Sequence, residues 1–190
     1  MNLCSIASGS SGNCIYVGSD KTSVLVDAGI SGKRIEQGLN SIERTTKDCD
    51  AILITHEHSD HVQSLGMVSS KYNIPVYANE KTWDAMPKQK ERISDTNQKF
   101  FKSYEKFEIG DLIINPFSIP HDAADPCGFN IINNNEKISI ATDIGHMTKS
   151  IVNKLDGSSF ILLESNYDPE ILKSGKYPYY LKTRILGPNG

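Results

Sequence analysis

Short apolar runs, bounded by small and polar residues, dominate the start of the chain. Residues 3–7 and 14–17 predict two strands, joined by a turn whose glycines permit positive-φ backbone. Residues 23–26 and 51–55 are compact apolar runs that are typical of buried strands. The first part of the chain is therefore predicted to be rich in short strands.

Helical periodicity separates and follows these runs. Apolar residues recur at helical spacing over residues 35–42, which predicts an amphipathic helix with Ser31 as its N-cap. The same spacing over residues 62–72 predicts a second helix, which ends at Asn73.

The rest of the chain alternates between the two patterns. We expect strands at 75–78, 100–103, 107–119 (with a turn at Gly110–Asp111), 127–132, 137–142 and 160–164, the last of them buried. We expect short helices through 83–86, 148–155 and 169–173, and a surface loop or helix at 87–96. Two sheets with helices outside fit this order, although periodicity by itself equally allows a doubly wound sheet.

Composition narrows the class of protein. A chain of 190 residues with 38% hydrophobic and 23% charged residues predicts one soluble globular domain, 1–190. No apolar run approaches the length of a membrane span, and the start of the chain does not resemble a secretory leader. The four cysteines form no CxxC pair, so we expect reduced thiols and a cytoplasmic location, although Cys4 and Cys14 could face each other across a hairpin.

The net charge of −3 gives the chain no global basic field. Any nucleic acid must therefore be met by a local patch or by metal ions. The small basic cluster of Lys88, Lys90 and Arg92 is interleaved with acidic residues, and we interpret it as solvated surface.

The densest chemistry lies in the sequence Thr-His-Glu-His-Ser-Asp-His at residues 55–61. His56 and His58 leave a predicted strand two residues apart, so both imidazoles can point the same way, and Asp60 and His61 follow. Imidazole nitrogen and carboxylate oxygen are ligands for zinc, manganese or iron. The alternative, in which Asp60 caps a helix and the histidines decorate a turn, does not account for three histidines within six residues.

This motif also carries a family resemblance. His-x-His-x-Asp-His after an apolar strand resembles the signature of the metallo-β-lactamase fold, and Ser-Gly-Ser-Ser-Gly-Asn at residues 8–13 is similar to the YycJ/WalJ-like branch of that superfamily. The resemblance extends over essentially the whole chain. It implies a four-layer αββα sandwich and a metal-dependent hydrolase.

The resemblance also implies a set of ligands for two divalent ions, zinc or manganese, with iron as an alternative. One ion would be held by His56, His58, His121 and Asp143, and the other by Asp60, His61 and Asp143. Asp27 resembles an aspartate that orients a ligand histidine. A surface loop for His121, and a turn or a cap for Asp27, are the structural alternatives.

One further histidine is expected from the resemblance, on a late loop. After Asp143 this chain has only His146, and it ends at Gly187-Pro188-Asn189-Gly190, the phrase that the distal histidine follows in the branch. We therefore expect a domain that misses its C-terminal part, with a weakened second metal site.

Four residues are candidates for contacts with substrate, namely Ser10, Asn13, His146 and Asn166. Backbone N–H groups of residues 8–13 could also receive a phosphate. For each the alternative is structural: a tight turn, a satisfied loop histidine or the end of a strand.

The resemblance implies hydrolysis of phosphodiester bonds in DNA, in the manner of a 5′-to-3′ exonuclease. Hydroxide activated by the metals would attack, and Asp60 would take or deliver a proton. The alternatives are another phosphodiesterase of the superfamily, such as a tRNA 3′-processing or cyclic-phosphate hydrolase, and a metal-binding module without catalysis. Fold alone does not choose among them.

Overall fold

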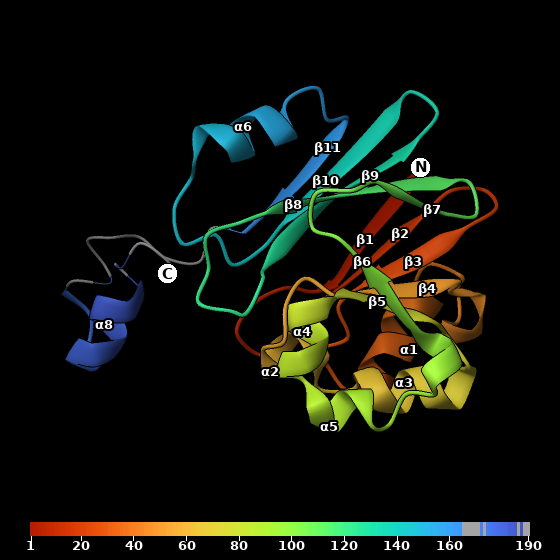
Figure 1. The fold of residues 1–190 in the computed structure, drawn as a ribbon, viewed down its shortest axis with the longest axis horizontal. Coiled ribbons are helices and arrows are strands. Elements are labelled where there is room, and N and C mark those ends of the chain that lie inside the picture. The colour runs from red at the N-terminus through yellow and green to blue at the C-terminus, as the bar shows by residue number, and fades with distance from the viewer. Residues whose placement is uncertain (165–171, 173, 186, 188–190) are drawn as a thin grey trace.

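The computed structural model describes residues 1–164, 172, 174–185 and 187 and contains two stacked β-sheets (Figure 1). The first sheet has the strand order β1-β2-β3-β4-β5-β6. Its strands are β1 (Asn2–Ala7), β2 (Cys14–Gly18), β3 (Ser23–Val26), β4 (Ala51–Leu53), β5 (Val76–Asn79) and β6 (Gln98–Phe101). Strands β3 to β6 run parallel, so their carboxyl ends meet at one edge of the sheet.

The second sheet has the order β11-β10-β9-β8-β7. Its strands are β7 (Phe107–Ile109), β8 (Leu112–Ser118), β9 (Cys127–Asn133), β10 (Glu136–Ala141) and β11 (Phe160–Leu163). Strands β7 to β10 form antiparallel hairpins, and β11 pairs parallel with β10 at the edge.

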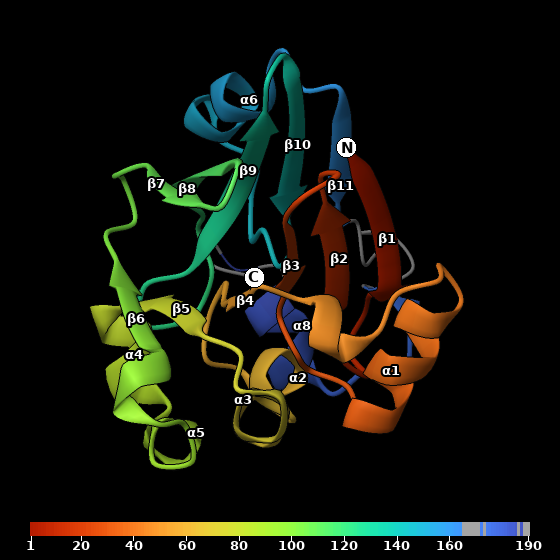
Figure 2. The same cartoon turned by 90° about the vertical axis from the view of Figure 1, so that its right-hand side faces the viewer.

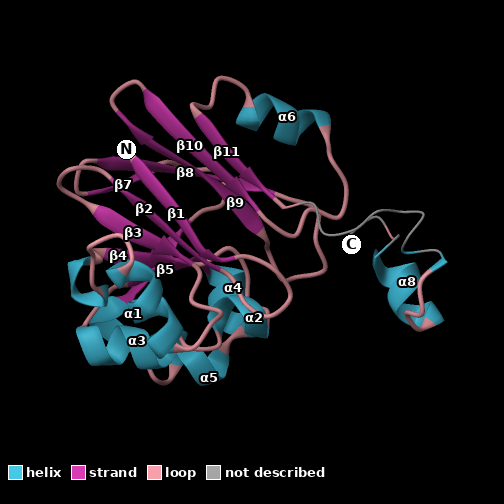
Figure 3. Cartoon of the chain, turned by 180° about the vertical axis from the view of Figure 1, so that it is seen from behind, coloured by secondary structure: helices cyan, strands magenta, loops and turns pink. Residues whose placement is uncertain are grey.

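Helices cover both outer faces, as Figures 2 and 3 show. Five helices follow strands of the first sheet: α1 (Gly32–Asn40), α2 (Ser59–Val62), α3 (Leu65–Tyr72), α4 (Glu80–Ala85) and α5 (Pro87–Lys90). The 3-10 turns η1 (Thr46–Asp48) and η2 (Asp95–Asn97) complete this layer, α6 (Lys149–Leu155) covers the second sheet, and α8 (Tyr179–Ile185) comes last. None of the described helices is long and apolar enough to cross a bilayer.

Three clusters of buried apolar side chains pack the four layers against one another. Trp83 and Leu25 belong to the cluster between the first sheet and its helices. Leu53 and Phe129 belong to the cluster between the sheets, and Ile151 belongs to the one under α6. Successive residues of a strand point to opposite faces, so a sheet buried on both sides needs continuous apolar runs. This explains the short apolar runs of the sequence.

Most predicted elements are confirmed. The Ser31 side chain accepts from the Arg34 backbone N–H at the start of α1, and Asn73 ends α3 in the left-handed region with φ 56°. The predicted helix at 62–72 is divided, because α2 ends at Val62 and α3 begins at Leu65. The predicted helix at 169–173 lies outside the described residues.

The prediction of a buried strand at 160–164 is wrong in its burial. Phe160, Ile161 and Leu163 are 54%, 43% and 45% exposed, because β11 is the last described strand of its sheet. An apolar run specifies a strand, but it does not say whether both faces are covered.

Candidate metal centre

The candidate site lies where the carboxyl ends of the first sheet face loops of the second. Asp27 directly follows β3, and the loop that begins at Ile54 carries His56 and His58 into α2. His121 follows β8, and Asp143 follows β10. Four segments far apart in the sequence therefore supply the side chains.

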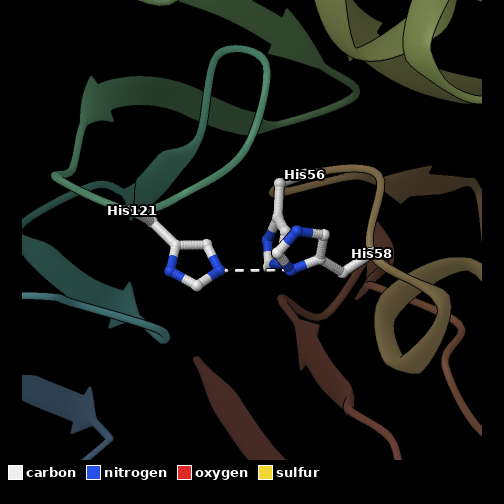
Figure 4. Close-up of side chains that lie close together, drawn as sticks. All are labelled: His56, His58 and His121. Carbon is white, nitrogen blue, oxygen red and sulfur yellow. Dashed lines mark hydrogen bonds between the residues drawn. The ribbon is translucent and has the colours of Figure 1, made fainter. Parts of the chain in front are cut away.

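Three histidines face one another in this space (Figure 4). The His121 Nε2 atom lies 3.2 Å from the His58 Nδ1 atom. The ring centroid of His56 lies 4.6 Å from that of His58 and 4.7 Å from that of His121. One ring nitrogen from each lies within 4.8 Å of the others, a spacing that can hold a metal ion.

His56, His61 and Asp143 form a second such group. The His61 Nε2 atom lies 3.1 Å from Asp143 Oδ2 and 3.7 Å from Asp60 Oδ2. The residue common to both groups is His56, whereas the sequence predicted that Asp143 would be shared. Five of the six predicted ligands nevertheless belong to these two groups, and Asp60 belongs to neither but lies beside His61.

Burial keeps His56 in its neutral form, the form in which an imidazole can bind a metal ion. Its side chain is fully buried, and burial, helped by the nearby His61, lowers its pKa to about 2. The Nδ1 atom lies 3.0 Å from the Thr55 hydroxyl, while Nε2 has no hydrogen-bond partner among the described residues. An unpaired buried nitrogen in a ring of imidazoles and carboxylates fits a metal ligand.

Asp27 orients His61 and is itself held by Thr55. The His61 Nδ1 atom lies 2.8 Å from Asp27 Oδ2, with both side chains fully buried. Thr55 donates its backbone N–H to Asp27 Oδ1 at 2.9 Å and its hydroxyl to Oδ2 at 2.8 Å. Burial opposes a charge on His61, but Asp27 and Asp143 outweigh it and raise its pKa to about 10. The carboxylates thus favour a cation at this ring.

Asp27 and Asp143 share an unusual backbone geometry. Their φ angles are 63° and 53°, in the left-handed region that non-glycine residues rarely adopt. Glu164 accepts the backbone N–H of Asp143 at 2.7 Å, which helps to hold that turn. Left-handed backbone at non-glycine residues is a form of strain that concentrates at functional sites.

The carboxyl group of Asp143 is also affected by its surroundings. Burial would raise its pKa, but the hydrogen bond with His61 outweighs burial and lowers the pKa of Asp143.

Close backbone contacts fix the loops of the first sheet. Asp60 accepts the N–H of Asn13 at 2.7 Å, and Asn13 in turn accepts the N–H of Gly29 at 2.8 Å. A Cβ atom at Gly29 would lie only 1.6 Å from the Asp60 carbonyl oxygen. Only glycine therefore lets the loop after β3 pass this close to the metal-binding motif.

Hydrogen bonds also hold the loop that carries His121. Glu57 accepts the N–H of Ala124 at 2.9 Å. Asp125 accepts the Asn79 amide through its carbonyl at 2.7 Å and the Ser103 hydroxyl through its carboxylate at 2.9 Å. These bonds connect the second sheet's loop to the ends of β5 and β6.

The predicted substrate residues have different environments. Asn13 is 1% exposed, and its amide nitrogen lies 3.0 Å from His61 Nε2. Ser10 and His146 are exposed, and His146 belongs to neither metal-binding group among the described residues. Asn166 lies outside the described residues. The backbone N–H groups of Gly9, Gly12 and Asn13 already bond within the protein, so they are not directed at a ligand.

Sequence reasoning missed two supporting residues. Thr55 immediately precedes the histidines, and its hydroxyl touches Asp27 and both His56 and His61. Glu164 ends a strand, but only the sheet pairing of β11 with β10 brings it beside Asp143. The position of Thr55 directly before the motif was the one available signal.

Comparisons with known proteins show the family of the chain. The profile of the β-lactamase superfamily domain matches residues 22–176. Exodeoxyribonuclease YycJ of Bacillus anthracis is 44% identical over 97% of this chain, which spans 70% of that protein. Exodeoxyribonuclease WalJ of Streptococcus pneumoniae is 40% identical over 97% of this chain, again spanning 70% of the relative.

Solved structures share the fold at low sequence identity. Zn(2+)-bound PqqB from Methylobacterium extorquens has a TM-score of 0.71 at 17% identity, covering 87% of this chain and 64% of PqqB. The metallo-β-lactamase fold protein YhfI from Bacillus subtilis has a TM-score of 0.70 at 16% identity, covering 87% of this chain and 70% of YhfI. The chain belongs to the β-lactamase superfamily with its αββα metallo-β-lactamase fold, in the branch of YycJ and WalJ.

Proposed function

We propose that this protein is a metal-dependent hydrolase that cleaves phosphodiester bonds in DNA from the 5′ end. The proposal rests on the cluster formed by His56, His58 and His121. Within this cluster the buried Nε2 atom of His56 has no hydrogen-bond partner among the described residues. The substrate rests on the two exodeoxyribonuclease relatives, each aligned over 97% of the chain.

We assign the ligands as follows. His56, His58 and His121 would hold one ion, and His61, Asp60 and Asp143 would hold a second. Imidazole and carboxylate donors suit zinc or manganese. Bound divalent ions lower the pKa of water and stabilise negative charge on the phosphate oxygens.

The chain's own residues supply orientation and proton transfer. Asp27 accepts the Nδ1–H of His61 and so keeps Nε2 directed into the site. Asp60 lies next to this nitrogen with a side chain 31% exposed, which lets it reach both water and substrate. We assign Asp60 the role of taking a proton from the attacking water and returning it to the leaving oxygen.

Charge and thiols bear on the partner and the compartment. With a net charge of −3 the protein depends on its metal ions to meet the phosphate backbone. The four cysteines are free, three of them buried, which favours a reducing compartment such as the cytoplasm.

The test is nuclease activity with Mn²⁺ or Zn²⁺ on duplex DNA labelled at either the 5′ or the 3′ end. We expect early release of the 5′ label, and at least a hundredfold loss of rate in His58→Ala, since a ligand is removed. His146→Ala is the matched histidine control and should bind metal with wild-type affinity. Preference for RNA or cyclic phosphodiesters would redirect the proposal to the other phosphodiesterases. Metal binding without hydrolysis of DNA, RNA or cyclic phosphodiesters would refute the proposal that the protein is a phosphodiesterase.

A further inference from the structure

A pocket of about 310 Å³ opens at the edge of the first sheet. Its lining comes from β1, β2 and the turn after α1: Asn2, Leu3, Cys4, Tyr16, Ile42 and Arg44. Asn13, which bonds to Asp60, precedes β2, whereas Gly18 ends that strand and pairs with Asn2. The five residues of β2 span roughly 16 Å, so the Asn2 end of the pocket lies well away from the metal-binding motif.

The hydroxyl group of Tyr16 is a polar group without a partner at the wall of this pocket. The residue is 2% exposed and packs in the core cluster between the first sheet and its helices. Its oxygen makes no hydrogen bond with the described residues, yet it keeps accessible surface, so it faces the pocket. A Cβ atom at Gly18 would lie 2.4 Å from this oxygen, so the glycine leaves room for the hydroxyl. The hydrogen-bond partner of Tyr16 must therefore come from the contents of the pocket.

Arg44 brings a positive charge to the same pocket. Its side chain forms no ion pair or hydrogen bond with the described residues. The turn that carries it is held, because the Arg44 backbone N–H donates to the Leu39 carbonyl at 2.9 Å, and Glu43 before it adopts a φ of 57°. A guanidinium group can donate two parallel hydrogen bonds to one oxyanion. The pocket is thus suited to an anion.

The rest of the lining indicates what the anion is attached to. Leu3, Ile42 and the ring of Tyr16 supply apolar surface, and Asn2 supplies an amide. Together with Arg44 and the Tyr16 hydroxyl, this amide makes three donor groups. Three donors match the three terminal oxygens of a phosphate monoester better than the two oxygens of a carboxylate. The volume lies at the lower end of the roughly 300–1,000 Å³ of small-molecule sites.

We propose that this pocket binds a small organic phosphate monoester. Arg44, Tyr16 and Asn2 hold the phosphate group, and the organic group lies against Leu3 and Ile42. None of these residues takes part in the proposed hydrolysis, so the pocket is a second binding site, separate from the metal centre.

The test follows the backbone amide NMR signals of Cys4, Tyr16 and Arg44 while Zn²⁺-loaded protein is titrated with phenyl phosphate. These amides report on the pocket separately from any phosphate at the metal centre. We expect saturable shifts, and an affinity about tenfold or more lower in Arg44→Gln and in Tyr16→Phe, as for lost hydrogen bonds to a charged group. Arg34→Gln, at an exposed arginine of α1, is the matched control and should bind as wild type.

Two results would overturn the proposal. One is the absence of saturable shifts at these amides with millimolar phenyl phosphate. The other is wild-type affinity in both pocket variants, whose NMR spectra also show that they fold. Benzoate carries a carboxylate on the same ring and should bind more weakly, so equal or tighter binding of benzoate would refute the assignment of a phosphate.

Discussion

The two sheets contribute to the site in different ways. The first sheet presents His56 and His61 fully buried, on loops locked by Asp27, Thr55 and Gly29. The second sheet presents His121 and Asp143 on loops after its strands, and the described part of that sheet ends in the exposed edge β11. The first half therefore contributes buried, hydrogen-bonded side chains, and the second half completes the metal-binding space with loops that follow the strands of a sheet with a more exposed edge.

The largest loss of stability should come from the closest backbone contact in the loops of the first sheet. Gly29→Ala sets a Cβ atom 1.6 Å from the Asp60 carbonyl oxygen, so backbone must move. We expect the free energy of unfolding to fall by about 4 kcal/mol or more. The control Gly157→Ala, with φ 70° and open space around the Cβ, should cost only about 1–2 kcal/mol. Urea unfolding measures both, and equal losses would contradict the close-contact argument.

A pair of strand substitutions sharpens the comparison of the halves. Leu53 in β4 is fully buried between the sheets, whereas Ile161 in β11 is 43% exposed. We expect Leu53→Ala to cost about 2–5 kcal/mol and Ile161→Ala less than about 1 kcal/mol in the same experiment. A large loss from Ile161→Ala would mean that β11 is covered in solution.

Neutralising the orienting aspartate should weaken the metal site. Asp27→Asn keeps the shape but removes the charge that accepts from His61 Nδ1. We expect metal affinity to fall about 10- to 100-fold. Asp111→Asn is the control, because Asp111 also accepts a buried hydroxyl, from Ser19 at 2.7 Å, but lies in a distant turn. A metal affinity of Asp27→Asn equal to that of the control would show that His61 needs no orienting charge.

The smallest effect is expected on the second half. Glu164→Ala removes the acceptor of the Asp143 N–H and so loosens its left-handed turn. We expect metal affinity to fall about threefold to tenfold, and Glu108→Ala, an exposed residue of β7, to leave it unchanged. A loss greater than that of Asp27→Asn, measured in the same titration, would reverse the ranking of the two halves.

The sequence predicted the fold well, because apolar runs and capping residues are local signals. Motif spacing and family resemblance predicted six candidate ligands, of which five lie in the two groups of possible metal-binding side chains, with Asp60 beside His61. It could not predict the exposure of β11, which depends on what covers a sheet edge. It also missed the contact of Glu164 with Asp143, since only the pairing of β11 with β10 creates it. Pairing between distant segments is not written in local periodicity.

Anomalous X-ray scattering from crystals of the protein grown with Mn²⁺ or Zn²⁺ would locate the bound ions directly. We expect a peak among His56, His58 and His121, with a second, weaker peak beside His61 and Asp143. The first peak should vanish in His58→Ala and persist in His146→Ala. A peak elsewhere on the molecule, or none at all at saturating metal, would contradict the metal centre described here.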